Sequence, residues 1–390
     1  MKKIIVHDYA GHPFTFSFSK VLAKKYKVYH LFFANDPGPK SDLNKGKNKN
    51  LSILGIGKTI SYNKNNFFLR FFKDIQYGIE VKKKINIIKP DIVISANCPT
   101  FAQQSILSAT KENNSKFIMW IQDFYSIAVH QTLKKKFSFF SFFISFLFTI
   151  LEKKQIKLSD HLITISKDFN KTLLKWGVDK KKITFIPNWG NLDQIKVGKK
   201  DYHFLKKNNL SKDKLRIVYS GTLALKHNPD LIISIAKENL DMELLITAGG
   251  SGFDSLKKRK DLPPNIKLLP LQPFQIFNKV LNSADFFLAM LNKEASKFSV
   301  PSKILNYLCV GKPIILSAPL TNLSSKVIFD AKAGKTFDPT DFNKLNNFIK
   351  LLKNNNKIRL QMANNGRLYA KTNFNLKKVS IKFVNIFNKI

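Results

Sequence analysis

The sequence predicts an α/β protein built from two doubly wound, Rossmann-like parallel-sheet domains. At 390 residues the chain is about 2.6 times as long as a 150-residue domain, so each half is large enough for its own core. In both halves, continuous apolar runs alternate with helical stretches, which is typical of parallel strands covered by helices on both faces. Hydrophobic residues at 44% and charged residues at 24% are ordinary for a globular protein.

Apolar runs bounded by turn or charged residues predict the strands of the first half. These runs are KKIIV at 2–6, VYHLFF at 28–33, DIVISAN at 91–97, FIMWIQD at 117–123, HLITIS at 161–166 and ITFIP at 183–187. A helical pattern follows the first run from about Phe14 to Lys25, and an amphipathic segment covers 67–88. Residues 34–50 are predicted as loop, because turn residues and charges occur there without a period.

The second half repeats this pattern. Its predicted strands are RIVYSG at 216–221, ELLITAGG at 243–250, IKLLP at 266–270, FFLAML at 286–291, PIILSA at 313–318 and AGKTF at 333–337. Polar residues interrupt the pattern near 190–212, which indicates a linker. We therefore expect a first domain at 1–198, a second at 199–375, and a final helix at 376–390 that folds back on the first domain.

The stretch KFSVPSKILNYLCVGKPIIL at 297–316 is predicted as a loop, a helix and a buried strand. Pro301 suits the first helical position, and Gly311 followed by a proline ends the helix. A helix start offers free N–H groups and about half a positive charge, so it suits a phosphate. Ser302 and Lys303 lie in that first turn, and Asn306 lies one turn later. The alternative is an ordinary helix start that binds nothing.

Two further loops would meet this helix start at the carboxyl ends of the strands. The first holds Gly221, Thr222 and Lys226, and the second contains Gly250 and Ser251. Small residues let the main chain approach a ligand, and the two lysines Lys226 and Lys303 can neutralise phosphate charge. Any turn between a strand and a helix can use glycine. Three such loops at one sheet edge nevertheless indicate a site for a nucleoside diphosphate.

The loop after the first strand lies where doubly wound sheets bind ligands. It contains Gly11 and His12, and Asn97 ends a neighbouring predicted strand. Gly11 is a lone glycine, so the GxGxxG fingerprint of a dinucleotide site is absent there. We assign these three residues to the ligand-binding edge of the first sheet.

The segment FSFFSFFISFLFTIL at 137–151 is apolar apart from serine and one threonine, and lysines flank it on both sides. As a helix it would span about 22 Å, short of the roughly 30 Å of bilayer hydrocarbon. It therefore fits an interfacial anchor, in which rings enter the acyl boundary and lysines meet anionic headgroups. The alternative is a helix of the protein core.

The formal charge of +40 implies an anionic partner, such as a membrane surface, a phosphorylated ligand or nucleic acid. Almost all the cations are lysines, whereas specific base reading relies on arginine, so we expect no specific nucleic acid. An AT-rich genome would also favour lysine. Cys98 and Cys309 lie in apolar stretches, which favours a reducing compartment. The histidines form no metal-binding pattern, and no signal peptide opens the chain.

Several strings resemble family 4 glycosyltransferases of the GT-B fold. PSKILNYLCVGKP is similar to their donor-site helix, and DHLITISKDFNKTLLKWGV, KKITFIPNWG, VYSGTLALKHNPD and LLITAGGSGFDSLKK are similar to other family passages in the same order. IQDFYSIAVH resembles a loop of the subgroup that builds colanic acid and O-antigen sugars. The resemblance implies two domains facing a cleft, with the acceptor on the first and the nucleotide sugar on the second. It would thus place Gly11, His12 and Asn97 on the acceptor side.

The family resemblance also implies transfer with retention and without a metal or other cofactor. Main-chain amides, Lys226, Lys303 and the helix dipole would stabilise the departing diphosphate. Ser299 and Ser302 would join the donor site. The resemblance to the subgroup implies a donor in which UDP is linked to an L-fucosamine-type or other N-acetylated 6-deoxy sugar.

Asp123 and His130 are the candidates for orienting or deprotonating the acceptor hydroxyl. Asp123 follows a predicted strand directly, at the edge of the sheet where ligands bind, whereas His130 could equally be a surface residue. Many relatives carry two glutamates eight positions apart near the donor helix. Phe298 and Asn306 occupy these positions here, so Asn306 offers a ribose hydrogen bond in place of a carboxylate, and Glu294 is a nearby substitute for the first.

The sequence thus predicts a glycosyltransferase of cell-surface polysaccharide synthesis that acts on a lipid-linked or polysaccharide acceptor. We expect it in the cytoplasm, peripheral on the inner face of the cytoplasmic membrane. One alternative is a sugar-nucleotide epimerase on the same fold, which needs no acceptor and no anchor, so the Phe-rich segment argues against it. Another is a non-enzymatic basic module that binds membrane or nucleic acid, which leaves the three converging loops without a role.

Overall fold

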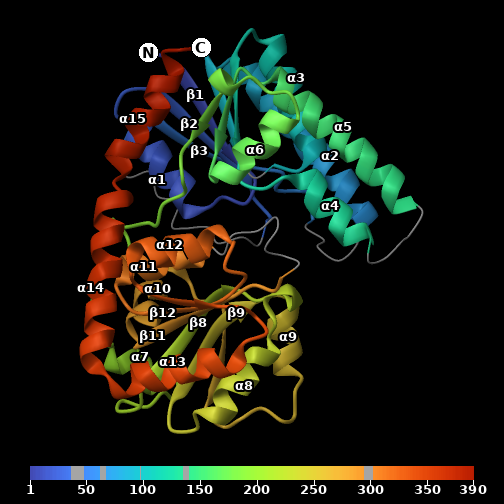
Figure 1. The fold of residues 1–390 in the computed structure, drawn as a ribbon. Coiled ribbons are helices and arrows are strands. Elements are labelled where there is room, and N and C mark those ends of the chain that lie inside the picture. The colour runs from blue at the N-terminus through green and yellow to red at the C-terminus, as the bar shows by residue number, and fades with distance from the viewer. Residues whose placement is uncertain (37–47, 62–66, 97, 135–139, 294–301) are drawn as a thin grey trace. The chain divides into compact units, whose positions relative to one another are not determined.

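The computed structural model describes residues 1–36, 48–61, 67–96, 98–134, 140–293 and 302–390, which form two compact units (Figure 1). The first unit comprises Met1–Asn188 and Leu376–Ile390, and the second comprises Trp189–Asn375. The boundary thus lies earlier than the expected one at 198. The reason is a set of hydrogen bonds that tie the segment after Trp189 to helix α10 (Phe274–Asn282): Lys196 N and Gly198 N donate to Asn278 and Asn282 at 3.0 and 2.7 Å.

Within the described residues, the first unit contains a seven-stranded parallel sheet in the order β3-β2-β1-β4-β5-β6-β7. The strands are β1 (Lys3–Asp8), β2 (Lys27–Phe33), β3 (Leu51–Ile56), β4 (Ile92–Ala96), β5 (Lys116–Ile121), β6 (His161–Thr164) and β7 (Ile183–Phe185). Strand β3 was not predicted. The order reverses between β1 and β4, and such a switch point is where open α/β sheets bind ligands at the carboxyl ends of their strands.

Helices cover both faces of the first sheet. On one face α1 (Pro13–Leu22) packs against the C-terminal helix α15 (Leu376–Phe387), with ring centroids of Phe18 and Phe383 4.3 Å apart. The final helix therefore belongs to the first unit. Apolar residues of the other face pack against further helices, which are α2 (Phe67–Ile88), α3 (Thr100–Glu112), α5 (Phe140–Leu158) and α6 (Lys167–Lys175). Helix α4 (Tyr125–Lys134) packs on α5.

In its described residues, the second unit has a six-stranded parallel sheet in the order β10-β9-β8-β11-β12-β13. The strands are β8 (Arg216–Thr222), β9 (Glu243–Gly249), β10 (Ile266–Pro270), β11 (Phe286–Met290), β12 (Ile314–Ser317) and β13 (Gly334–Phe337). Its central strands are buried on both faces, as their continuous apolar runs predict. Here the switch point lies between β8 and β11, so the loops after these strands are placed to bind a ligand.

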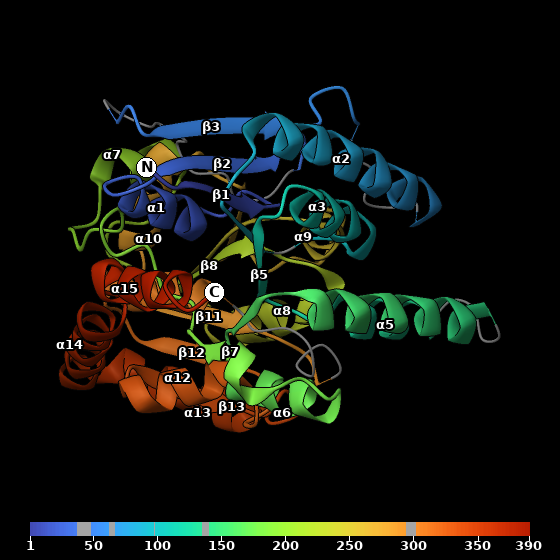
Figure 2. The same ribbon diagram turned by 90° about the horizontal axis from the view of Figure 1, so that it is seen from above.

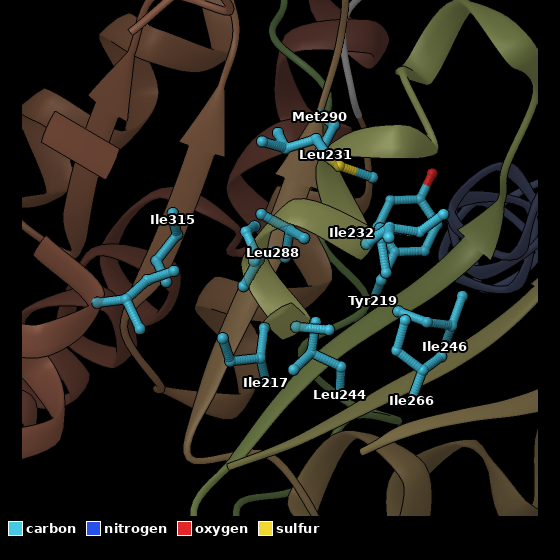
Figure 3. Close-up of a cluster of buried hydrophobic side chains, with 14 of the residues drawn as sticks. Ile217, Tyr219, Leu231, Ile232, Leu244, Ile246, Ile266, Leu288, Met290 and Ile315 are labelled. Atoms are coloured by element: carbon cyan, nitrogen blue, oxygen red, sulfur yellow. The ribbon is translucent and has the colours of Figure 1, made fainter. Parts of the chain in front are cut away.

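The core of the second unit lies between this sheet and helices α8 (Asp230–Glu238), α9 (Ser251–Lys257) and α13 (Phe342–Asn354). Figure 3 shows part of it, with Ile217, Leu244 and Leu288 of the sheet gathered near Ile232 of α8. The remaining helices are α7 (Tyr202–Lys207), α11 (Lys303–Val310), α12 (Leu323–Ala331) and α14 (Asn356–Asn373), and two short 3₁₀ turns are η1 (Lys180–Lys182) and η2 (Leu225–His227).

Candidate functional site

Two loops of the second unit are joined at the carboxyl edge of its sheet. After β8, Leu223 N donates to Gly249 O at 2.9 Å, and Gly252 N donates to Leu223 O at the same distance. Gly221 and Gly250 have φ values of 119° and 110°, which side chains rarely allow. A Cβ at Gly252 would lie 2.9 Å from the main chain of Ala224. These loops therefore need glycine in order to pack together.

Lys303, the first residue of helix α11, reaches the loop after β8. Its Nζ donates to Thr222 O at 3.3 Å and lies 3.5 Å from the centroid of the Tyr219 ring. A Cβ added at Gly221 would lie 3.7 Å from Lys303 Cε, so the lysine passes over this glycine. The structure thus gathers Gly221, Thr222 and Lys303, three of the predicted donor-site residues.

Tyr307, one turn further along α11, fixes the helix to strand β8. Ser220 N donates to the Tyr307 hydroxyl at 2.9 Å, and the ring stacks on Phe287 of β11 with centroids 3.9 Å apart. Burial raises the pKa of Tyr307, so its hydroxyl stays neutral. Gly190 packs against the other side of the helix, where a Cβ would lie 2.4 Å from Leu305 O. The position of Lys303 is therefore held by a buried framework.

The other predicted donor residues are distributed around this framework. Ser302 is exposed at the N-cap of α11, Ser251 is exposed at the first position of α9, and Asn306 is half-buried on α11. Lys226 lies in η2, and its side chain is outside the described part of the structure. Ser299 lies outside the described residues, as do Phe298, Glu294 and Pro301.

In the first unit, the carboxyl end of β1 carries the buried Asp8, which pairs with the half-buried His12. Asp8 accepts hydrogen bonds from His12 N at 2.7 Å, from His12 Nδ1 at 3.0 Å and from Thr15 Oγ1 at 2.8 Å. Burial works against ionisation, but His12 and these hydrogen bonds together lower the pKa of Asp8. Burial also opposes charge on His12, yet Asp8 raises its pKa, with help from Asp36 and Asp123. The imidazole is therefore favoured in its charged form.

The predicted residues of the first unit are only partly brought together. Gly11 has a φ of 67° in the loop after β1, directly before His12. Asp123 is exposed just after β5 and lies near enough to His12 to raise its pKa. His130 is exposed on helix α4. Asn97 lies outside the described residues.

Other polar groups behind this edge serve the fold. His7 Nδ1 lies 2.9 Å from Ser95 Oγ, and its Nε2 lies 2.8 Å from the Tyr77 hydroxyl. Burial lowers the pKa of His7 to about 4, so the ring is neutral. The Tyr9 hydroxyl donates to Asp74 at 2.7 Å, and burial raises the pKa of that carboxyl to about 6. Among the described residues, no group of three His, Cys, Asp or Glu side chains could hold a metal.

The apolar segment predicted at 137–151 corresponds in its described part to the beginning of helix α5. Phe142, Phe143 and Phe146 are 71%, 63% and 53% exposed, whereas Phe148 is buried against Phe101. One face of the helix thus belongs to the core and the other is apolar and uncovered. The buried face agrees with the alternative of a core helix, and the interfacial anchor stays a prediction for the exposed face. None of the described helices is both long and apolar enough to span a bilayer.

Comparison with known proteins gives two family matches. The model described as Glycosyltransferase Family 4 matches residues 14–194, and the one described as Glycosyl transferases group 1 matches residues 202–369. The first match begins just after the Asp8–His12 pair and covers most of the first unit, and the second includes the loops around Lys303.

Two curated relatives are similar at the sequence level. The putative colanic acid biosynthesis glycosyl transferase WcaI of Escherichia coli (strain K12) is 24% identical over 237 residues, which are 59% of this chain and 58% of that protein. The uncharacterized glycosyltransferase MJ1069 of Methanocaldococcus jannaschii is 25% identical over 244 residues, 60% of this chain and 59% of that one. The alignments span less than two thirds of the length of either relative.

Solved structures show the fold over the whole chain. Sucrose-phosphate synthase from Thermosynechococcus elongatus has a TM-score of 0.78 at 13% identity, covering 100% of this chain and 99% of that one. HepE of Anabaena in complex with UDP-glucose has a TM-score of 0.71 at 12% identity, covering 100% of both chains. WaaG, a glycosyltransferase involved in lipopolysaccharide biosynthesis, has a TM-score of 0.68 at 14% identity, covering 98% and 99%. The two domain matches, which together cover residues 14–194 and 202–369, show that the chain belongs to the family 4 glycosyltransferases, and the solved structures show its GT-B fold.

Proposed function

We propose that this protein transfers a sugar from a nucleoside-diphosphate donor, most simply a UDP-sugar, to a lipid-linked or polysaccharide acceptor. The observation that carries the proposal is Lys303, which the start of α11 presents to the main chain at Thr222. Here the ammonium and nearby main-chain donors would stabilise the negative charge that develops on the departing diphosphate. The HepE structures in complex with UDP and with UDP-glucose support a UDP-linked donor.

The binding of UDP is the first test of this proposal. A thermal-shift screen with UDP, GDP, ADP and their sugars should single out one base, because a ligand raises stability once its concentration exceeds its Kd. We expect the UDP series to raise the melting temperature and Lys303→Met to reduce that rise. If no nucleotide shifts the melting temperature, the proposed donor site is wrong.

The first unit would supply the acceptor side. Asp123 would orient the acceptor hydroxyl or accept its proton, and His12, held by Asp8, would contact the same substrate. Asp123→Asn should lower turnover by about 10²- to 10⁴-fold, the usual contribution of general acid–base catalysis, while UDP binding persists. Full activity of the variant would remove Asp123 from the site. His130, exposed on α4, stays a weaker candidate for the same role.

We propose, from the family, that the reaction retains the anomeric configuration and needs no metal. Lys303 would then provide the positive charge that a divalent cation provides in metal-dependent transferases. Proton NMR of the first product formed would report the anomer. An inverted product, or activity that is lost with EDTA and restored by Mg²⁺, would contradict this part of the proposal.

The acceptor and the pathway are proposed from the relatives and from helix α5. The similarity to WcaI, named for colanic acid biosynthesis, supports a role in cell-surface polysaccharide synthesis. The uncovered apolar face of α5 supports a lipid-linked acceptor and a peripheral position on the inner face of the cytoplasmic membrane. Phe143→Ser/Phe146→Ser should release the protein from sedimented membranes. Unchanged sedimentation would leave the protein without its proposed anchor.

A further inference from the structure

Helix α5 has two faces of different character. Five large apolar side chains on the outer face are between 47% and 71% exposed, and they are Phe142, Phe143, Phe146, Leu147 and Ile150. Lys154 and Lys157 continue this face by helical spacing and are also exposed. The inner face instead carries Ser145, Glu152 and Gln155, all buried. The helix therefore presents an apolar and basic surface outward while burying polar groups inward.

Glu152 on the inner face holds the start of helix α4. Its carboxylate accepts hydrogen bonds from Tyr125 N at 2.8 Å and Ser126 N at 3.2 Å, and a further one from the Ser126 hydroxyl. These are the N–H groups that a helix start leaves without intrahelical partners. Because α4 begins directly after Asp123 and Phe124, this carboxylate fixes the loop at the carboxyl end of β5. Burial raises the pKa of Glu152 in spite of these hydrogen bonds.

Gln155, one turn further along, holds a second loop of the same edge. Its Nε2 donates to Thr100 O at 2.7 Å, at the first residue of helix α3. Thr100 follows the carboxyl end of β4, next to the switch point of the sheet. The buried side of α5 is thus bonded to the loops after β4, which pairs with β1, and after β5, the next strand of the sheet.

A second exposed apolar group lies near α5, at the start of helix α2. Phe72 is 64% exposed, and its neighbour Phe71 packs on Phe101 with ring centroids 4.6 Å apart. Phe101 in turn packs on Phe148 of α5 at 5.2 Å. Figure 2 shows α2 and α5 running along the same side of the first unit, with α3 between them. Both helices that carry these exposed apolar side chains therefore pack against α3.

The chemistry of this surface favours a bilayer with anionic headgroups. Aromatic and aliphatic side chains suit the boundary between headgroups and acyl chains, and Lys154 and Lys157 suit negative headgroups. A protein with a formal charge of +40 is drawn to such a membrane over its whole surface. A second copy of this chain would carry the same positive charge and would be repelled.

We propose that α5 couples contact with an anionic bilayer to the loops after β4 and β5, through Glu152 and Gln155. Lipid contact on the outer face orders α5, and its inner-face hydrogen bonds then order the starts of α3 and α4, where the acceptor would bind. Glu152 is thus a positioning residue, which acts on Asp123 through the start of α4. This inference rests on the proposed function, in which helix α5 contacts the membrane, and adds a route from that contact to the acceptor side.

Hydrogen–deuterium exchange with vesicles tests this coupling directly. The full chain is mixed with vesicles of phosphatidylcholine containing one third phosphatidylglycerol, and with vesicles of phosphatidylcholine alone. We expect the anionic vesicles to slow exchange in peptides covering 98–104 and 123–130 by about fivefold or more, the low end of typical coupling between two sites. Exchange in the second unit serves as the internal reference.

Substitutions distinguish binding to the bilayer from the effect of that binding on the loops after β4 and β5. Glu152→Gln should still sediment with anionic vesicles but lose the slowed exchange at 123–130. The amide keeps one acceptor oxygen, and its NH₂ group replaces the oxygen that accepts from the other of the two N–H groups, Tyr125 N or Ser126 N. If circular dichroism shows that Glu152→Gln is unfolded, Ser126→Ala is used as the test variant instead, because it removes only the hydrogen bond from the Ser126 hydroxyl to Glu152. Glu112→Gln, at an exposed ion pair with Lys82, is the matched control and should behave like the unaltered protein.

Three outcomes would overturn the proposal. Exchange at 98–104 and 123–130 could be unchanged when vesicles bind, Glu152→Gln could keep the slowed exchange, or the apolar surface could mediate self-association in light scattering without vesicle binding. The experiment uses neither donor nor acceptor. Its failure therefore leaves the UDP test of the transferase function untouched, and loss of UDP binding would not affect this result.

Discussion

Replacing Lys303 by methionine should weaken UDP binding without unfolding the second unit. The lysine Nζ is positioned by the Tyr219 ring at 3.5 Å and by Thr222 O at 3.3 Å, so the ammonium is already in place before a ligand arrives. A hydrogen bond from a charged donor contributes about 1.5–3 kcal/mol, which corresponds to a loss of about 10- to 150-fold in affinity. Methionine keeps the apolar stem against Tyr219 but removes the charge.

Isothermal titration calorimetry with UDP measures this loss, and Lys335→Met provides the control. Lys335 lies on the edge strand β13, is exposed, and places its Nζ 5.7 Å from the ring of Phe337, so it matches Lys303 in residue type and aromatic neighbour. The control should bind UDP like the unaltered protein. Equal affinity for the Lys303 variant, or an equal loss in both variants, would refute the role of Lys303 and leave only a general effect of positive charge.

Three further predictions concern the framework around the two edges. Gly190→Ala should lower the free energy of unfolding in urea by about 1–3 kcal/mol, because the new methyl group would collide with Leu305 O. Gly198→Ala, whose nearest contact would lie at 3.6 Å, should leave this free energy nearly unchanged. Equal effects of the two substitutions would contradict this packing. Arg216→Met should lower the free energy of unfolding in the same assay by roughly 3–5 kcal/mol, because it leaves the buried Glu243 carboxylate without the guanidinium that pairs with it. An effect no larger than that of Arg259→Met, at a surface ion pair, would contradict this reasoning. The pKa of Asp8 is lowered in the folded protein, so the contribution of Asp8 to stability is lost as the pH falls below the unfolded-state pKa of about 4. The pKa of His12 is raised, so the contribution of His12 is lost as the pH rises above the unfolded-state pKa of about 6.5. The melting temperatures of the unaltered protein and Asp8→Asn should therefore differ most between about pH 4 and 6.5, and a difference that is constant with pH would contradict the pairing.

The repeated apolar runs were sufficient to predict the fold. Strands such as β4 and β11 are buried along their whole length, so their residues form the largely apolar runs expected of parallel strands covered on both faces. Strand β3 was missed because LSILGI contains serine and glycine and its middle is only half-buried at the sheet edge. The resemblance to family 4 glycosyltransferases is confirmed by the domain matches. The domain boundary depends on side-chain bonds from Asn278 and Asn282, which no local pattern reveals.

The candidate site was predictable only where local chemistry marks it. The glycines at 221 and 250 and the start of α11 were visible in the sequence, and the structure shows that Lys303 meets the loop at Gly221. Tyr219 was not predicted, because its ring contributes to the core and only its contact with Lys303 shows a second role. Asp8 and Glu152 were also missed, since each is a single buried carboxylate whose partners lie in another segment or turn. Such pairings are set by tertiary structure.

The central claim is that the loops after β8 and β9 and the start of α11 hold a nucleoside diphosphate. A crystal structure of the protein with UDP tests it most directly. We predict the β-phosphate within about 3 Å of Lys303 Nζ, the distance of a charged hydrogen bond, beside the main chain of Gly221 and Thr222. Phosphates bound away from Lys303, or crystals that take up no UDP at concentrations far above those of sugar nucleotides in cells, would contradict the account.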